Sequence, residues 1–135
     1  MKKLYILGFL IALGLVFMNC SKDKDEDNNM GTNPNPTGIQ ITVSSGTNPQ
    51  YSWTGGNVMS ISVVRQSDPT TVVWGAANPT SDGIASPVTH GTLPAGTVPT
   101  SVLPNPETTL TAGVAYRVSV ARISGTATGY KDFTP

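Results

Sequence analysis

Residues 113–123, GVAYRVSVARI, alternate between apolar and polar side chains over most of their length. A period of two is the repeat of a β-strand, because successive side chains of a strand point to opposite faces. The apolar residues that share one face are Val114, Tyr116, Val118 and Val120. The stretch therefore predicts a strand with one face in a hydrophobic core and the other, which carries Arg117 and Ser119, toward water.

The same style of sequence recurs on both sides of this stretch. Short runs rich in valine, isoleucine, threonine and aromatic residues are separated by glycine, proline and asparagine: GIQITVSS (38–45), YSWT (51–54), NVMSISVVRQ (57–66), TTVVWGA (70–76) and KDFTP (131–135). None of them has the period of an amphipathic helix. Residues 38–135 are therefore predicted to form one all-β domain, an antiparallel sandwich of two sheets.

One segment breaks this rhythm. LPAGTVPTSVLPNPE (93–107) places an apolar residue before a proline every five residues. Proline donates no hydrogen bond to a sheet, so we expect an edge strand or an extended crossover between the sheets, with its apolar residues on the core. A proline-rich ligand for another protein is disfavoured, because the segment contains no PxxP.

The stretch LTAGVAY (110–116) resembles the corner that leads into the sixth strand of fibronectin type III domains. Four positions match that motif: Leu110, Ala112, Gly113 and Tyr116. The resemblance covers residues 38–135 and implies an immunoglobulin-like sandwich in which the Tyr116 hydroxyl bonds back to the main chain, as a tyrosine corner. It implies no particular function.

Two further positions are interpreted against this family. Trp53 lies where fibronectin type III domains place a core tryptophan on their second strand. The proline-rich segment stands where the family has its fifth strand, so it is expected to replace that strand.

The first 19 residues read as a signal peptide. Lys2 and Lys3 precede 15 uncharged residues, Leu4 to Met18. As a helix this run is about 22 Å long, and a bilayer core is about 30 Å thick. A secretory signal therefore fits better than a retained anchor helix, which is the alternative.

Cys20 follows this run, and a charged tract begins directly after it. The arrangement resembles a bacterial lipoprotein signal, although Phe17, Met18 and Asn19 stand where the usual lipobox has leucine and small residues. The resemblance implies that Cys20 carries fatty acyl chains such as palmitate and anchors the protein to the outer membrane, on its surface or periplasmic face. An ordinary signal with a free Cys20 is the other alternative.

Residues 20–37 are predicted to be a disordered tether. They open with the charged run SKDKDED and continue with asparagine and proline, with Met30 as the only large apolar residue after Cys20. Such a segment cannot bury enough apolar surface to fold. The acidic tract is either a solvated spacer or, by resemblance to some lipoproteins, a sorting signal for surface export.

Charge and composition exclude several classes of function. Charged residues make up 12% of the chain, and from Asn28 onward the acids and bases balance: Asp68, Asp82, Glu107 and Asp132 against Arg65, Arg117, Arg122 and Lys131. No basic stripe is available to bind nucleic acid. Cys20 is the only cysteine and His90 the only histidine, so no disulfide and no cysteine–histidine metal site is predicted. No hydrolase or nucleotide-binding motif occurs, and no cofactor is expected.

Three functions remain. The first is a non-enzymatic, lipid-anchored protein of the cell envelope whose sandwich binds a macromolecule or a glycan through an apolar or aromatic patch on one sheet face, as an adhesin does. Trp74 is the candidate contact residue for it, with a place in the core as its alternative. The second is a spacer protein of an envelope assembly without a ligand. The third is a small hydrolase or metal-binding domain, which needs His90 beside an acid or hydroxyl in a pocket. No feature of the sequence indicates an oligomeric state.

Overall fold

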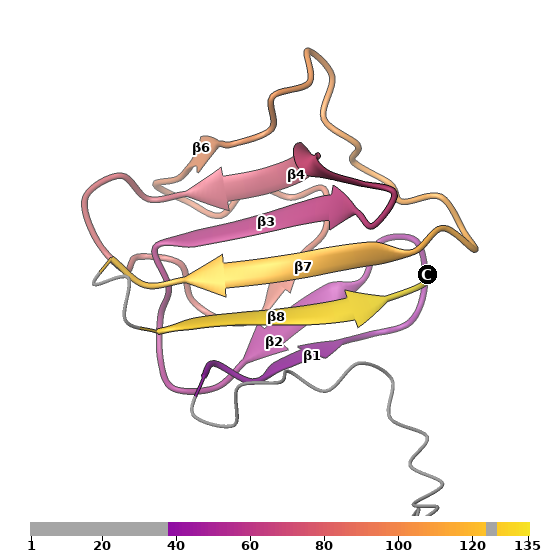
Figure 1. Cartoon of the computed structure of the whole chain (residues 1–135). Coiled ribbons are helices and arrows are strands. Elements are labelled where there is room, and N and C mark those ends of the chain that lie inside the picture. The colour runs from indigo at the N-terminus through magenta and orange to yellow at the C-terminus, as the bar shows by residue number, and fades with distance from the viewer. Residues whose placement is uncertain (1–37, 124–126) are drawn as a thin grey trace, which may run out of the picture.

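A computed structural model describes residues 38–123 and 127–135. The predicted signal peptide, Cys20 and the predicted tether lie outside these residues. Within the described residues eight strands follow one another (Figure 1): β1 (Ile41–Val43), β2 (Gln50–Trp53), β3 (Ser60–Arg65), β4 (Asp68–Ala77), β5 (Val88–Thr89), β6 (Val98–Pro99), β7 (Tyr116–Ala121) and β8 (Thr128–Phe133). In this part of the chain there is no helix that could cross a membrane.

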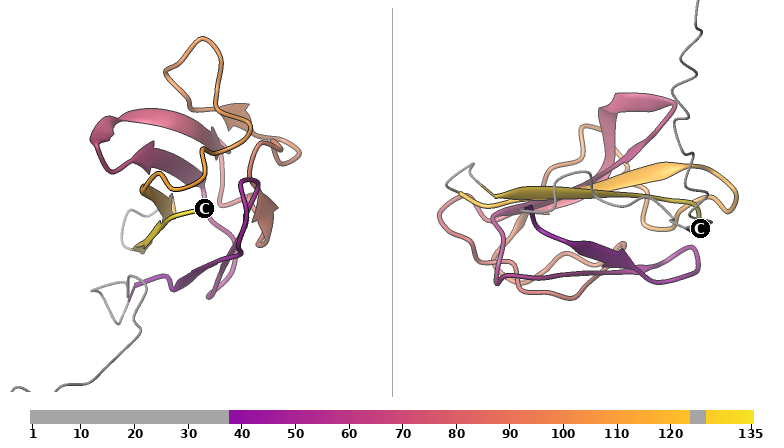
Figure 2. Two further views of the ribbon diagram at one scale, coloured as in Figure 1. Left: turned by 90° about the vertical axis from the view of Figure 1, so that its right-hand side faces the viewer. Right: turned by 60° about the horizontal axis from the view of Figure 1, so that its bottom comes forward.

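The strands form two antiparallel sheets that face each other (Figure 2). The smaller sheet has the strand order β1-β2-β5, and the larger has the order β6-β4-β3-β7-β8. In the larger sheet β3 pairs with both β4 and β7 along its whole length. The prediction of an all-β antiparallel sandwich of two sheets is confirmed.

The core lies between the two sheets and is built from their inward-facing residues. Strand β7, the stretch that predicted the fold, alternates as expected: Tyr116, Val118 and Val120 are buried, and the residues between them are half-buried. Trp53 of β2 is also buried, as predicted.

Strand β4 does not alternate, because Val73 to Ala76 are buried in succession. A β-bulge is one cause, since Val63 of β3 pairs with Trp74 and the next residue, Val64, pairs with Val72. The second cause is that the proline-rich segment covers the outer face of β4. Its residue Thr100 lies so close to Gly75 that a Cβ at Gly75 would collide with the Thr100 hydroxyl.

That segment forms β6 at the outer edge of β4, with Val98 opposite Ala77 and Pro99 opposite Ala76. The alternative of an edge strand is therefore confirmed. The expectation that the apolar residues of the segment lie on the core is right for Leu103, which packs against it, and wrong for Leu93 and Val98, which are exposed. The expectation that the segment replaces the fifth strand is wrong. β5 pairs with β2 in that place, and the proline-rich segment follows it. The sequence concealed β5 because a two-residue strand is too short to show a period.

The tyrosine corner is present. The N–H of Thr111 donates to the hydroxyl of Tyr116 at 3.1 Å, and Tyr116 is fully buried. Leu110 is buried, and Gly113 has a φ of +78°, which favours glycine at this turn. Leu110, Gly113 and Tyr116 thus have the burial, turn conformation and main-chain bond that the resemblance implied.

Candidate functional site

Most of the exposed large apolar side chains belong to one segment of the domain. In the described residues four large apolar side chains are exposed, and three of them lie within ten residues of each other: Leu93 (46%), Val98 (49%) and Val102 (71%). The fourth, Ile123 (54%), follows β7. We call residues 91–108 the proline-rich edge. Clustered exposed apolar residues mark interaction surfaces, whereas single ones are common on any protein.

A small recess opens between the proline-rich edge and β4. It has a volume of about 110 Å³, and its wall is formed by Trp74 and Gly75 of β4 and by Gly91, Leu93, Pro99, Pro106 and Thr108 of the edge. Because Gly75 has no side chain, Thr100 packs directly on the strand beside the recess. Every residue of this wall is uncharged.

Trp74 is 2% exposed, so the alternative of an exposed aromatic contact is wrong and the alternative of a core residue is right. The bulge and the cover over β4 turn its ring inward, where it packs 4.8 Å from His90 and 6.2 Å from Tyr51, measured between ring centroids. Trp74 lines the recess but is almost inaccessible to solvent.

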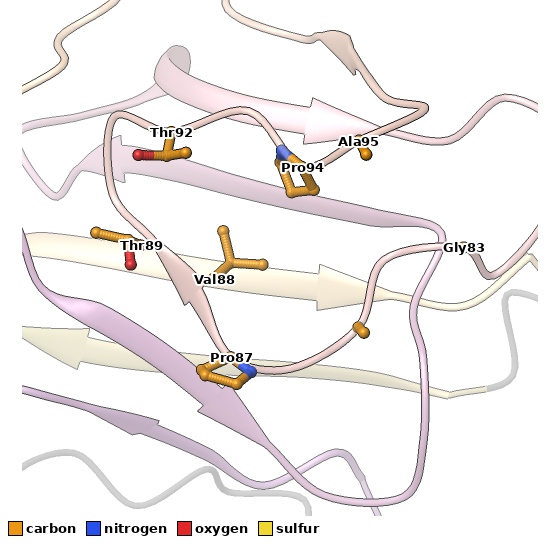
Figure 3. A pocket seen from close by; sticks show the side chains of 8 residues that line it. Gly83, Pro87, Val88, Thr89, Thr92, Pro94 and Ala95 are labelled. Carbon is orange, nitrogen blue, oxygen red and sulfur yellow. The ribbon is translucent and has the colours of Figure 1, made fainter.

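A larger hollow, with a volume of about 390 Å³, lies between β5 and the start of the same segment (Figure 3). Pro87, Val88 and Thr89 come from β5 and the residue before it, and Thr92, Pro94 and Ala95 come from the proline-rich edge. This hollow is also lined without a charge. Leu93 therefore lines the recess, and its two neighbours in sequence, Thr92 and Pro94, line the larger hollow.

Main-chain hydrogen bonds attach the proline-rich edge to β4. The N–H groups of Thr100 and Glu107 donate to the carbonyl groups of Gly75 and Val73, at 3.1 and 2.9 Å. The Ser101 hydroxyl donates to the Val72 carbonyl at 3.1 Å. The edge is thus bonded to β4 at several points, while Leu103 packs against the core and Leu93, Val98 and Val102 remain exposed.

The carboxylate of Glu107 adds side-chain contacts at the C-terminal end of the proline-rich edge. It accepts hydrogen bonds from Arg65 Nη2 at 2.5 Å and from the Tyr116 hydroxyl at 3.3 Å. Glu107 therefore joins the proline-rich edge to β3 and to the tyrosine corner.

His90 lies beneath the edge and is 1% exposed. Its Nε2 is 2.8 Å from the Glu107 carbonyl, which can only accept, so Nε2 carries the proton. Nδ1 then accepts the hydroxyl proton of Tyr51 at 2.9 Å. Burial lowers the pKa of His90 to about 4, although the bond to Glu107 acts in the opposite direction.

His90 thus has the neighbouring hydroxyl that a catalytic histidine needs, but it lies in the core rather than in a pocket. Neither depression is lined by His90. No three histidine, cysteine, aspartate or glutamate side chains approach each other as metal ligands anywhere in residues 38–123 and 127–135.

The outer face of the larger sheet is polar. Ser62, Ser119 and Tyr130 lie side by side across β3, β7 and β8. The Arg117 guanidinium lies 4.3 Å from the centre of the Tyr130 ring and pairs with Asp132 through two hydrogen bonds of 2.7 and 2.9 Å. Those bonds hold the pKa of Asp132 below its usual range. The apolar patch expected on a sheet face is therefore not on this face, and the exposed apolar residues lie at the edge instead.

Comparisons with protein-family models, with curated proteins and with solved structures found no match to this chain. The candidate site therefore rests on its geometry. Sequence reasoning missed Leu93, Val98 and Val102 as contact residues. The signal that could have found Leu93 and Val98 is the apolar–proline repeat, because prolines hold a segment extended and at an edge, where side chains can face outward. Val102 is not part of that repeat.

Proposed function

We propose that this chain is a non-enzymatic lipoprotein of the cell envelope, anchored through Cys20, whose sandwich binds another protein at the proline-rich edge. The observation that carries the proposal is that one short segment exposes three large apolar side chains, Leu93, Val98 and Val102, and that Leu93 lines an uncharged recess. An apolar side chain of the partner would enter the recess, as the anchor residue of an interface does.

The position of the edge supports this proposal. The chain enters the domain at Ile39, whose N–H donates to the Thr128 carbonyl of β8 at 3.1 Å. Strands β8 and β6 are the two outermost strands of the larger sheet (Figure 1), four strand spacings apart. At about 4.8 Å per spacing this is about 19 Å. A lipid on Cys20 would therefore be joined to the domain on the β8 side, away from the proline-rich edge.

The chemistry of the edge favours a protein over a glycan. Glycan sites stack sugar rings on exposed aromatic side chains, and Trp74, the aromatic residue nearest the recess, is buried. The partner would dock by its side chains. Pro99 offers no N–H on the outer side of β6, so an added strand would find no regular ladder there.

Site-specific photo-crosslinking of the full chain in its native envelope tests this function. A photoreactive phenylalanine analogue at Val102 should yield one stoichiometric protein adduct, and the adduct should weaken at least tenfold when Leu93→Ser is added. The same analogue at Ile123, which is exposed elsewhere on the domain, is the matched control and should not yield that adduct. The same adduct from both positions, or none from Val102, would favour a spacer without a ligand. Retention on a polysaccharide that Leu93→Ser abolishes would favour a glycan.

The anchor has its own test. Mass spectrometry of the mature N-terminus should find Cys20 as residue one, carrying acyl chains, because two or more chains are needed for firm attachment. Cys20→Ala should remove the lipid label and release the protein from the membrane fraction. A lipid-labelled band that persists in this variant would contradict the anchor.

A further inference from the structure

We propose that His90 is an acid-sensitive latch: protonation of its ring releases the proline-rich edge from the sandwich. The consequence for partner binding rests on the function proposed above, whereas the release itself does not.

The geometry of His90 joins three parts of the fold. Its ring nitrogens bond to Tyr51 of β2 and to the Glu107 carbonyl of the proline-rich edge, and its ring packs on Trp74 of β4. These contacts cross from the smaller sheet to the larger one. His90 also directly precedes Gly91, and Glu107 precedes Thr108, and these two neighbours line the recess. The hydrogen bond between His90 and the Glu107 carbonyl therefore also holds the neighbouring residues Gly91 and Thr108 in place at the recess.

Only the neutral ring fits these partners. In the neutral form Nε2 donates to Glu107 and Nδ1 accepts from Tyr51. A protonated ring donates from both nitrogens, so the Tyr51 hydroxyl would have to turn its own proton away into the core. A buried donor without an acceptor is costly, and so is a buried charge without a counter-charge.

No described charged side chain compensates for that proton. Burial dominates the lowering of the pKa of His90 to about 4, and the other contribution comes from the Glu107 carbonyl. From β2 the ring faces the Tyr51 hydroxyl, and from β4 it faces the uncharged ring of Trp74. The Glu107 carboxylate is bonded instead to Arg65 and to the Tyr116 hydroxyl. Proton uptake therefore favours a state in which His90 reaches water.

The proline-rich edge is the element that can yield. Its attachment consists of a few bonds to β4, the contacts of the Glu107 carboxylate with Arg65 and Tyr116, and the bond from Asn48 to the Thr108 carbonyl. By contrast, β3 pairs along six residues with β4 on one side and with β7 on the other. Opening the edge exposes His90 without separating the two sheets. An exposed His90 with the ordinary pKa of about 6.5 would raise the opening equilibrium constant by about 20-fold between pH 7 and pH 5.

Native-state hydrogen exchange on the full chain, in detergent micelles and without a partner, tests the latch. The amides of Thr100 and Glu107 report the edge, and the amides of Val58 and Met59, which bond to Ile84 and Ala121, report the sandwich. After correction for intrinsic exchange rates, protection at Thr100 and Glu107 should fall by about 20-fold from pH 7 to pH 5. It should also be nearly independent of urea, as expected of a local opening, whereas protection at Val58 and Met59 should fall steeply with urea.

The variant His90→Gln completes the test. A glutamine amide can donate to Glu107 and accept from Tyr51 but does not titrate, so the pH effect on Thr100 and Glu107 should disappear. Protection of the edge that does not change with pH in the natural protein would overturn the proposal. So would edge amides that share the urea dependence of Val58, because the edge would then open only with the whole domain. Since no partner is present, either result leaves the proposed binding function standing.

Discussion

Replacement of Tyr116 by phenylalanine tests the tyrosine corner with the smallest possible change, the loss of one oxygen atom. The ring is fully buried and stacks on Phe133 with centroids 6.0 Å apart, so the packing of the variant is preserved. What disappears is the acceptor for the Thr111 N–H, at 3.1 Å, and the donor to the Glu107 carboxylate, at 3.3 Å.

The expected loss follows from these two bonds. An amide N–H left without a partner in a partly buried site costs about 1–3 kcal/mol. The bond to Glu107 is long, and its carboxylate keeps Arg65 as a partner, so it adds little. We expect the free energy of unfolding to fall by about 2 kcal/mol. For a domain of this size that lowers the melting temperature by roughly 8–16 °C.

Urea unfolding followed by tryptophan fluorescence measures this loss. The midpoint should fall while the urea dependence of the free energy stays the same, because the two variants expose the same surface on unfolding. Tyr130→Phe is the matched control, since Tyr130 is half-buried on the outer face of β8, and its effect should be within about 0.5 kcal/mol. An unchanged midpoint for Tyr116→Phe would refute the corner as a source of stability.

Two further outcomes are expected. The free energy of unfolding should fall by about 2 kcal/mol from pH 7 to pH 5, because burial lowers the pKa of His90 to about 4 from an ordinary value of about 6.5. The unfolded chain takes up the proton that the folded chain excludes, so this stabilisation is complete above pH 6.5 and is lost progressively as the pH falls toward 4; equal urea midpoints at both pH values would contradict it. Gly129→Ala should cost about 1–3 kcal/mol, because its new methyl group would meet the Ile39 carbonyl. Calorimetry measures this loss, and an unaltered melting temperature would show that Ile39 does not pack against β8.

The sequence predicted the fold through strands that have one buried and one wet face. In β7 every second residue is buried, as the alternation of side chains along a strand requires, so the sequence pattern identified Tyr116, Val118 and Val120 as core residues. In β4 the buried residues do not alternate with exposed ones. The bulge and the cover by Thr100 bury four residues in a row, which is why the place of Trp74 could not be decided from its neighbours.

The candidate site was hidden for a different reason. Periodicity describes regular strands, and the proline-rich edge contributes only the two-residue strand β6. Whether Leu93 or Val102 faces the core or water depends on how the segment crosses from β5 to β4, which is a property of the tertiary structure. The same holds for His90. Its burial depends on Tyr51 and on Glu107, which are 39 and 17 residues away in the chain.

The two outermost strands of the larger sheet also bear on how copies of this domain behave when they are crowded. One end of β8 is occupied by Ile39, and Lys131 lies in the middle of that strand. At the other border, Pro99 leaves β6 without a donor where a neighbouring sheet would need one. Lysine and proline at such borders oppose the fusion of sheets into fibres. Dense arrays of this protein should therefore stay as separate domains, which keeps the exposed valine and leucine side chains available for a specific partner rather than for self-association.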